Sequence, residues 1–247
     1  MKFDVCIYTN SGGRSYNEDR AEGWTDGTGG LFVVADGLGG HGDGDKAAAC
    51  VTAAMHKAWD DHRAQPENKE WLPSAVAKAN EAVLQMQKET GGRMKSTLVA
   101  LEVDDTRARW AHVGDSRLYH ISAGHISLVT EDHSVTYKKF RAGEITRMQM
   151  NFDEDRSSLL RAVGDPTRCL PEIGGSDGPL GAGDAFLLCT DGFWEYLHEE
   201  EILVDSLKAD SAQAWMEAML LRAMERMRPD SDNLTAMAIF LQPGGAL

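Results

Sequence analysis

Short segments of apolar or alternating residues predict eight β-strands along this chain. They cover residues 3–9, 31–35, 96–103, 107–113, 117–122, 126–129, 185–189 and 234–241. Apolar residues at helical spacing predict helices over residues 44–63, 73–90, 135–142, 199–207 and 212–228. The second helix shows the pattern most clearly, because Pro73 suits its first turn, Gly91-Gly92 marks its end, and one stripe holds Ala75, Val76, Ala79, Val83, Leu84 and Met86.

The order of these segments predicts the fold class. The strands between residues 96 and 129 follow one another closely, with turns expected at Asp104-Asp105 and Ala123-Gly124, so we expect an antiparallel meander. Runs of strands, then helices, then strands favour α+β layers over alternating βαβ units. Residues 130–179 have the least regular pattern and predict a small flap, after which the chain is expected to return to the core at Asp184.

Composition and charge exclude several classes of function. The 247 residues carry 39 acidic and 25 basic side chains, a net charge of −14, which argues against a nucleic-acid partner. The apolar runs are too short for a membrane span, and Asp4 precedes any long apolar region, which argues against a signal peptide. Four widely spaced cysteines form no CxxC pair, and three of them lie in apolar segments, so we expect buried thiols in a reducing compartment and a cytoplasmic protein.

One glycine-rich turn matches the pattern of a dinucleotide-binding loop. Gly37, Gly39 and Gly42 fit GxGxxG between a predicted strand and a predicted helix. However, the carboxylates of Asp36, Asp43 and Asp45 surround the point where a pyrophosphate would lie, and they would repel it. The match by itself is weak, and these acidic residues count against it.

The same acidic pattern recurs along the chain and points to bound cations. An apolar strand ends in or next to an aspartate at Asp36, Asp115 and Asp191, and Asp232 immediately precedes the last strand. A single Asp-Gly pair usually marks only a turn, and Asp115 has the alternative of capping one. Several carboxylates brought together would repel one another unless cations or raised pKa values made the cluster tolerable.

The type of ligand selects the type of ion. The candidate ligands are oxygen atoms without cysteine or an obvious histidine, which favours Mg²⁺ or Mn²⁺ over zinc or copper. An EF-hand loop fails because Leu38 and Gly40 occupy ligand positions, and a P-loop fails because Lys46 is followed by Ala47.

Eight motifs in order then resemble one known family. They are Arg14 with Asn17-Glu18-Asp19, and residues 35–41 (ADGLGGH), 95–98 (KSTL), 113–117 (VGDSR), 130–134 (TEDHS), 159–164 (LLRAVG), 189–192 (CTDG) and 231–235 (SDNLT). Together they resemble the metal-dependent protein phosphatases, type 2C, in their compact bacterial form. The resemblance spans essentially the whole chain. It implies an α-β-β-α sandwich in one catalytic domain, residues 1–247, with a flap at about 131–179.

The resemblance also implies roles for the acidic residues. Asp36 would bridge two Mn²⁺ or Mg²⁺ ions, the Gly37 carbonyl would bind one, and Asp191 and Asp232 would complete the other. Asp115 would help to hold a third, weaker ion. Glu18 and Asp19 match a pair that either orients metal-bound water or binds a metal directly, and the motifs leave both roles open.

By the same resemblance, Arg14 clamps the substrate phosphate, and with Asp36 and Asp191 it forms the catalytic set. The bland alternative for Arg14 is an exposed surface arginine. Some family members carry a histidine after the Asp-Gly that is proposed to protonate the leaving group. Leu38 stands there instead, so the general acid stays open, with His41 as a weaker candidate.

The expected activity is hydrolysis of phosphoserine or phosphothreonine on proteins by a metal-bridging water, opposing a serine/threonine kinase in bacterial signalling. Two alternatives are an enzyme on small phosphate esters and an inactive regulatory binding module. The presence of Arg14, Asp36, Asp191 and Asp232 disfavours the inactive form. We expect a monomer whose partners are phosphorylated proteins, with neither nucleic acid nor membrane among them.

Overall fold

Two antiparallel sheets face each other in the computed structural model, which describes residues 2–39, 43–65, 68, 70–176 and 178–242. The first sheet has the order β1-β11-β10-β7-β8, and the second has the order β2-β3-β5-β6-β9 with β4 paired to β3. The strands are β1 Lys2–Asn10, β2 Asp19–Thr25, β3 Gly29–Leu38, β4 Lys95–Ser96, β5 Leu98–Asp104, β6 Ala108–Val113, β7 Arg117–Ser122, β8 His125–Val129, β9 Glu172–Gly175, β10 Ala185–Cys189 and β11 Leu234–Gln242.

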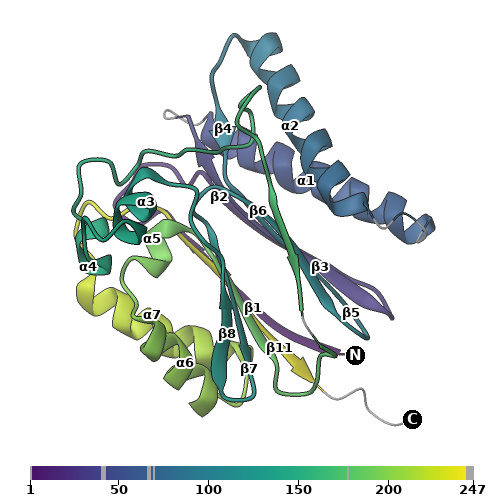
Figure 1. Cartoon of the computed structure of the whole chain (residues 1–247), viewed down its shortest axis with the longest axis vertical. Coiled ribbons are helices and arrows are strands. Elements are labelled where there is room, and N and C mark those ends of the chain that lie inside the picture. The colour runs from purple at the N-terminus through teal and green to yellow at the C-terminus, as the bar shows by residue number, and fades with distance from the viewer. Residues whose placement is uncertain (1, 40–42, 66–67, 69, 177, 243–247) are drawn as a thin grey trace.

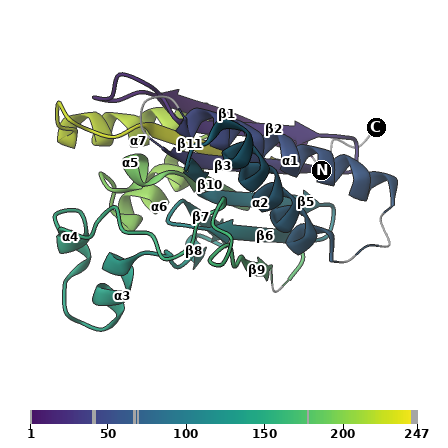
Figure 2. The same cartoon turned by 90° about the horizontal axis from the view of Figure 1, so that it is seen from above.

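The helices lie outside the sheets. They are α1 Gly44–Ala64, α2 Trp71–Thr90, α3 Val135–Arg141, α4 Arg147–Met150, α5 Asp191–Trp194, α6 Glu199–Lys208 and α7 Ala212–Arg226. Figure 1 shows α1 and α2 against one sheet, α6 and α7 against the other, and α3, α4 and α5 gathered at the end of the sandwich away from the start of β1. In Figure 2, α3 and α4 project from the body of the molecule.

Three apolar clusters hold these layers together. Leu31 and Val33 of β3 pack against α1 and α2, whereas Phe32 and Val34 of the same strand point between the sheets. On the other side, Trp215 of α7 joins a cluster that also includes residues of β10 and β11. Because β3 is buried on both faces, its sequence is a continuous apolar run instead of an alternating one. The predicted four-layer α+β sandwich is confirmed.

The predicted meander is wrong in one respect. β5 pairs with β6 and β7 pairs with β8 as expected, but β6 and β7 belong to different sheets. The chain crosses between the sheets at residues 114–116, where Gly114 has φ +109, a conformation that a residue with a Cβ rarely adopts. The side-chain hydroxyl groups of Ser116 and Thr97, which lies beside β5, then share a hydrogen bond with their oxygens 2.7 Å apart. The crossing places Asp115 between the two sheets.

Several elements have no clear signal in the sequence. β2 is a largely exposed edge strand without apolar alternation, and β4, α4 and α5 have four residues or fewer. β9 lies inside the predicted flap and pairs with β6, so the chain rejoins a sheet before Asp184, where we expected the return. The helix predicted from Pro73 begins two residues earlier, at Trp71, which leaves Pro73 in the first turn.

Two expectations from composition also concern the fold. Cys6, Cys50, Cys169 and Cys189 are all free thiols, but only Cys189 is buried, so the expectation of buried thiols is wrong for the other three, which are half-buried. Among the described residues, the helices are all too short or too polar to cross a membrane.

Candidate active site

The acidic residues predicted from the sequence meet at one end of the sandwich. Asp19 and Asp36 are directly paired residues of β2 and β3. Asp115 lies at the crossing between sheets, Asp191 begins α5, and Asp232 precedes β11. One pocket of about 360 Å³ is lined by Arg14, Glu18, Asp36, Gly37, Asp115, Asp191 and Asp232, together with six neighbouring residues that include Leu38. Asp19 is buried and is not among the lining residues.

Burial and mutual repulsion raise the pKa values of these carboxyl groups. Burial is the largest cause for each, and it raises the pKa of Asp19 and of Asp115 to about 7. The pKa values of Asp36 and Asp191 rise well above the usual range, because burial is reinforced by the charges of the neighbouring aspartates. Such a cluster is stable only when it holds protons or cations.

The donor set fits a hard divalent cation. The side chains that line the pocket offer carboxylate oxygens, and Gly37 offers a backbone carbonyl, which are the ligands preferred by Mg²⁺ and Mn²⁺. Asp19 accepts a hydrogen bond of 3.0 Å from Thr190 at Oδ2, while its buried Oδ1 has no hydrogen-bond partner among the described residues. An orphaned buried carboxylate oxygen beside other carboxylates is the kind of atom that a cation or its water shell satisfies.

Arg14 is the positively charged side chain at this pocket that the sequence singled out. Its Nη2 donates a hydrogen bond of 2.9 Å to Oδ2 of Asp232, and both side chains are about half exposed. Arg14 sits in the loop between β1 and β2, so its side chain reaches the carboxylates from a segment far from Asp232 in the sequence. The guanidinium therefore has access to solvent and to a ligand in the pocket.

Asn233 positions that loop, a role that the sequence did not reveal. Its Nδ2 donates to the carbonyl oxygens of Ser11 at 2.9 Å and Tyr16 at 2.8 Å, and its Oδ1 accepts from the Glu18 amide at 2.8 Å. The available signal was its place beside Asp232 in the SDN motif. A short amide at this position satisfies backbone groups on both sides of Arg14.

Gly37 and Glu18 join β3 to the start of α1. A Cβ on Gly37 would overlap the carbonyl oxygen of Gly44 and come within 2.6 Å of the carbonyl oxygen of Glu18. The Glu18 carboxylate accepts from the Gly44 amide at 3.0 Å, which places its negative charge at the N-terminus of α1. In this structure, Glu18 therefore helps to begin a helix as well as lining the pocket.

A buried ion pair packs against Trp194, which in turn holds the backbone of Asp115. Arg117 donates from Nε and Nη2 to the two carboxylate oxygens of Asp132, both at 2.7 Å, and its Cζ lies 3.4 Å from the centroid of the Trp194 ring. Trp194 in turn donates from Nε1 to the backbone oxygen of Asp115 at 3.0 Å. The sequence placed Arg117 and Asp132 in motifs without predicting that they pair.

The general acid was sought in the glycine-rich turn that follows β3. Leu38 lines the pocket, and its side chain has no proton to donate. His41 lies outside the described residues. Asp43, another acidic residue of the glycine-rich turn, forms an ion pair of 3.0 Å with Lys46.

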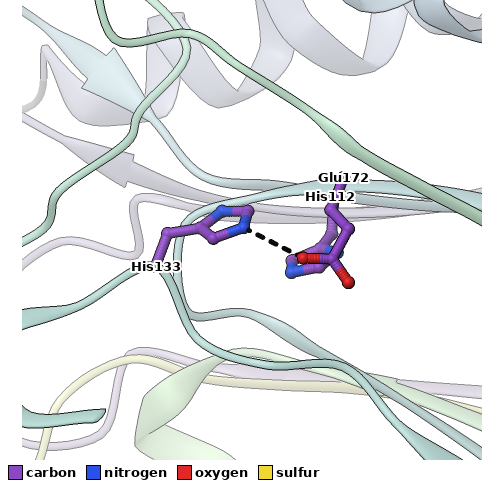
Figure 3. A group of neighbouring side chains, drawn as sticks. All are labelled: His112, His133 and Glu172. Atoms are coloured by element: carbon purple, nitrogen blue, oxygen red, sulfur yellow. Dashed lines mark ion pairs between the residues drawn. The ribbon is translucent and has the colours of Figure 1, made fainter. Parts of the chain in front are cut away.

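A second group of side chains with metal-ligand chemistry lies between the flap and the second sheet. Figure 3 shows His112 of β6, His133 before α3 and Glu172 of β9, whose candidate ligand atoms lie within 4.8 Å of one another. The two imidazole rings stack with an interplanar angle of 8°, and His133 Nε2 lies 3.0 Å from Nη1 of Arg161. Ring lone pairs lie in the ring planes, so two parallel rings do not converge on one ion. This group joins the flap to the sheet.

The fold and the pocket together define a class of protein. Two facing antiparallel sheets, covered by helices on both outer faces, present a cluster of carboxylates and the accessible Arg14 at one end. This is the architecture of a metal-dependent phosphatase.

Comparisons with known proteins identify the family. The family model described as protein phosphatase 2C matches residues 10–237. The serine/threonine phosphatase stp of Listeria monocytogenes is 32% identical over 177 residues, which cover 70% of this chain and 69% of that protein. The chain belongs to the protein phosphatase 2C family, and it is a protein serine/threonine phosphatase.

Solved structures agree with this conclusion. The serine/threonine phosphatase PstP/Ppp of Mycobacterium tuberculosis is 27% identical and has a TM-score of 0.82, with 97% of this chain and 99% of that chain covered. A structure of the catalytic domain of PstP in complex with two manganese ions is 26% identical and has a TM-score of 0.80, covering 97% and 98%.

Proposed function

We propose that this phosphatase holds two divalent cations, Mn²⁺ or Mg²⁺, at the carboxylate pocket. Asp36, the Gly37 carbonyl, Asp191 and Asp232 would hold the two core ions, Asp115 would help to hold a third, weaker ion, and Glu18 and Asp19 would act beside them. Phosphorylated proteins are its substrates. The observation that carries the proposal is the convergence of Asp36, Asp115 and Asp191 on one small pocket, with Asp19 paired to Asp36, all four with raised pKa values.

Divalent cations supply two things at such a site: they neutralise charge on the phosphoryl oxygens and they lower the pKa of water. The residues of this chain provide the rest. Arg14 offers a planar guanidinium for bidentate binding of a phosphate, and Asp232 holds it at the rim of the pocket at 2.9 Å. Asp36 and Asp191, as part of the cation site, would place the phosphate beside the attacking water.

The manganese in the related PstP structure supports Mn²⁺ as the ion to test first.

Two narrower points are part of the same proposal. The enzyme reverses the action of a serine/threonine kinase, because that is the reaction that supplies phosphoserine and phosphothreonine. The flap, at about residues 131–179, is a subdomain of a single catalytic domain.

One assay tests the proposal. Hydrolysis of a phosphothreonine peptide should require Mn²⁺, stop with EDTA, and fall by a factor of about 10³ or more in Asp191→Ala, because a cation ligand is removed. The matched control is Asp60→Asn, which removes an exposed carboxylate on α1 and should leave the rate unchanged. Activity that survives chelation and Asp191→Ala would exclude the two-cation site.

A parallel measurement separates cation binding from catalysis. Mn²⁺ at 100 times its Kd should stabilise the folded protein by about 2.7 kcal/mol. The melting temperature should therefore rise with Mn²⁺ in the wild type and in Asp60→Asn, and rise less in Asp191→Ala. An absence of any shift in the wild type would mean that the acidic cluster binds no Mn²⁺.

A further inference from the structure

A second hollow lies beside the catalytic pocket, between α4 of the flap and the segment that follows α5. It encloses about 480 Å³, within the range usual for sites that bind small ligands or single side chains. It adjoins the acidic end of the molecule, because it shares five lining residues with a second cavity there, here called the catalytic cavity, which is lined by Arg14, Asp115, Asp191 and Asp232. The shared residues are Asn151, Trp194, Glu195, Tyr196 and Arg228.

The walls of this hollow are largely apolar. Met148 and Phe152 come from the flap, are 69% and 72% exposed, and together line this hollow as one apolar wall. Leu197 and Tyr196, both buried, form the opposite wall. Two facing apolar walls of this kind fit an apolar side chain.

Hydrogen bonds hold the walls in place. Asn151 donates from Nδ2 to the carbonyl oxygen of Glu195 at 2.7 Å, which ties the flap to the end of α5. Arg226 donates from Nη1 to the carbonyl oxygen of Tyr196 at 2.7 Å, which fixes the opposite wall to α7. The hollow is thus part of the folded structure and keeps a defined distance from Asp191.

Arg228 stands at the boundary between the hollow and the catalytic cavity. It lines both, and its Cζ lies 5.4 Å from the centroid of the Phe152 ring. Its positive charge suits a substrate that carries a phosphate on one side of this boundary and an apolar side chain on the other. A separate ligand with no phosphate would gain nothing from the proximity of the two cavities.

We propose that the hollow binds an apolar side chain of the phosphoprotein substrate, a few residues from the phosphorylated serine or threonine. This proposal rests on the proposed function, since it requires a polypeptide substrate whose phosphate lies at Arg14 and the acidic cluster. An extended segment advances about 3.3 Å per residue, so it spans two adjoining cavities with a short stretch of chain. Met148 and Phe152 are then the residues that set sequence preference.

The experiment compares phosphothreonine peptides that differ only in one residue. Leucine or alanine is placed in turn at each of the four positions on either side of the phosphothreonine, and kcat/KM is measured with Mn²⁺. At one of these positions, kcat/KM of the wild type should be about tenfold higher with leucine than with alanine. The change should appear in KM, because the extra carbon atoms of leucine are bound in an apolar pocket. The double variant Met148→Ala/Phe152→Ala should lose this preference.

Two controls make the result specific. The double variant Leu221→Ala/Met224→Ala removes side chains of α7 that are 66% and 67% exposed and that do not line the hollow, and it should keep the preference. Hydrolysis of p-nitrophenyl phosphate, which is too small to reach the hollow, should stay within about twofold of the wild type in both double variants. Thermal melting would confirm that both fold.

Three outcomes would overturn the proposal. They are an absence of preference in the wild type at every position, a preference that survives Met148→Ala/Phe152→Ala, and an equal loss of p-nitrophenyl phosphate hydrolysis in that variant. The last would mean that the two side chains support the flap. A wild type that hydrolyses p-nitrophenyl phosphate but none of the peptides would instead overturn the protein substrate, and the subsite with it.

Discussion

Asp19 of β2 and Asp36 of β3 stand directly opposite each other in an antiparallel pair, with the edge strand β2 carrying one of them. Like charges in this arrangement are destabilising, and the pocket that Asp36 lines also holds further carboxylates, while Asp19 is buried. Their proximity lowers the stability of the folded state at any pH at which both carboxyl groups are ionised. The fold accepts this cost at the point where a cation site is expected.

The first prediction concerns the stability of the metal-free protein as a function of pH. The pKa values of Asp19 and Asp115 are about 7 when folded, against about 3.9 in an unfolded chain. Between these values the folded state binds protons that the unfolded state has released, so stability is highest at the acid end. It should fall as the pH rises from about 4 to about 7, by up to about 1.4 kcal/mol per unit and bound proton.

Urea unfolding in EDTA at pH 5.5 and 7.5 would measure this slope. Asp115→Asn should reduce it, and Asp60→Asn, on the surface of α1, should leave it unchanged. A metal-free protein that is more stable at pH 7.5 than at pH 5.5 would contradict the prediction.

The second prediction concerns Arg14. Arg14→Lys keeps the positive charge but loses the planar pair of donors, so kcat/KM for a phosphopeptide should fall by about 10- to 100-fold. The rise in melting temperature with Mn²⁺ should persist, because Arg14 is not expected to bind the cation. Arg93→Lys, at an exposed position after α2, is the matched control. Unchanged kinetics in Arg14→Lys would favour a surface arginine without a role in binding phosphate.

The third prediction tests the close approach of β3 to α1. A methyl group at residue 37 would overlap the Gly44 carbonyl, so Gly37→Ala should lower the free energy of unfolding by about 2 kcal/mol or more. Gly27→Ala places its methyl group in open space and should change that free energy by less than about 0.5 kcal/mol. Chemical denaturation of both variants would measure the difference, and equal stabilities would show that the strand and helix can separate freely.

The fourth prediction concerns the buried ion pair beneath Asp115. Arg117→Met leaves the Asp132 carboxylate buried without its partner and should cost about 3–5 kcal/mol. The double variant Arg117→Met/Asp132→Leu removes both charges and should recover much of that loss. For comparison, Arg141→Met breaks an exposed pair with Glu131 and should cost less than about 1 kcal/mol. A double variant no more stable than Arg117→Met would mean that packing on Trp194 matters more than charge.

Much of the fold was predictable because local patterns carried it. The buried run of β3, the amphipathic stripe of α2 and the turn at Ala123-Gly124 all have direct signals in the sequence, and the structure confirms them. The exposed strand β2 and the short strand β9 have no such signal, since they become strands by pairing with β3 and β6. Their hydrogen-bond partners lie in other segments, which a local pattern does not record.

The candidate site divides in the same way. By itself, the sequence determined which side chains are the candidates for the chemistry, because carboxylates at strand ends and an arginine near the start of the chain are visible as residue types and motifs. The tertiary structure decided how they meet: the crossing between β6 and β7 inserts Asp115 between the sheets, Asn233 holds the loop of Arg14, and Arg117 is buried against Asp132. These contacts join residues distant along the chain, and only packing of the two sheets brings them within hydrogen-bonding distance.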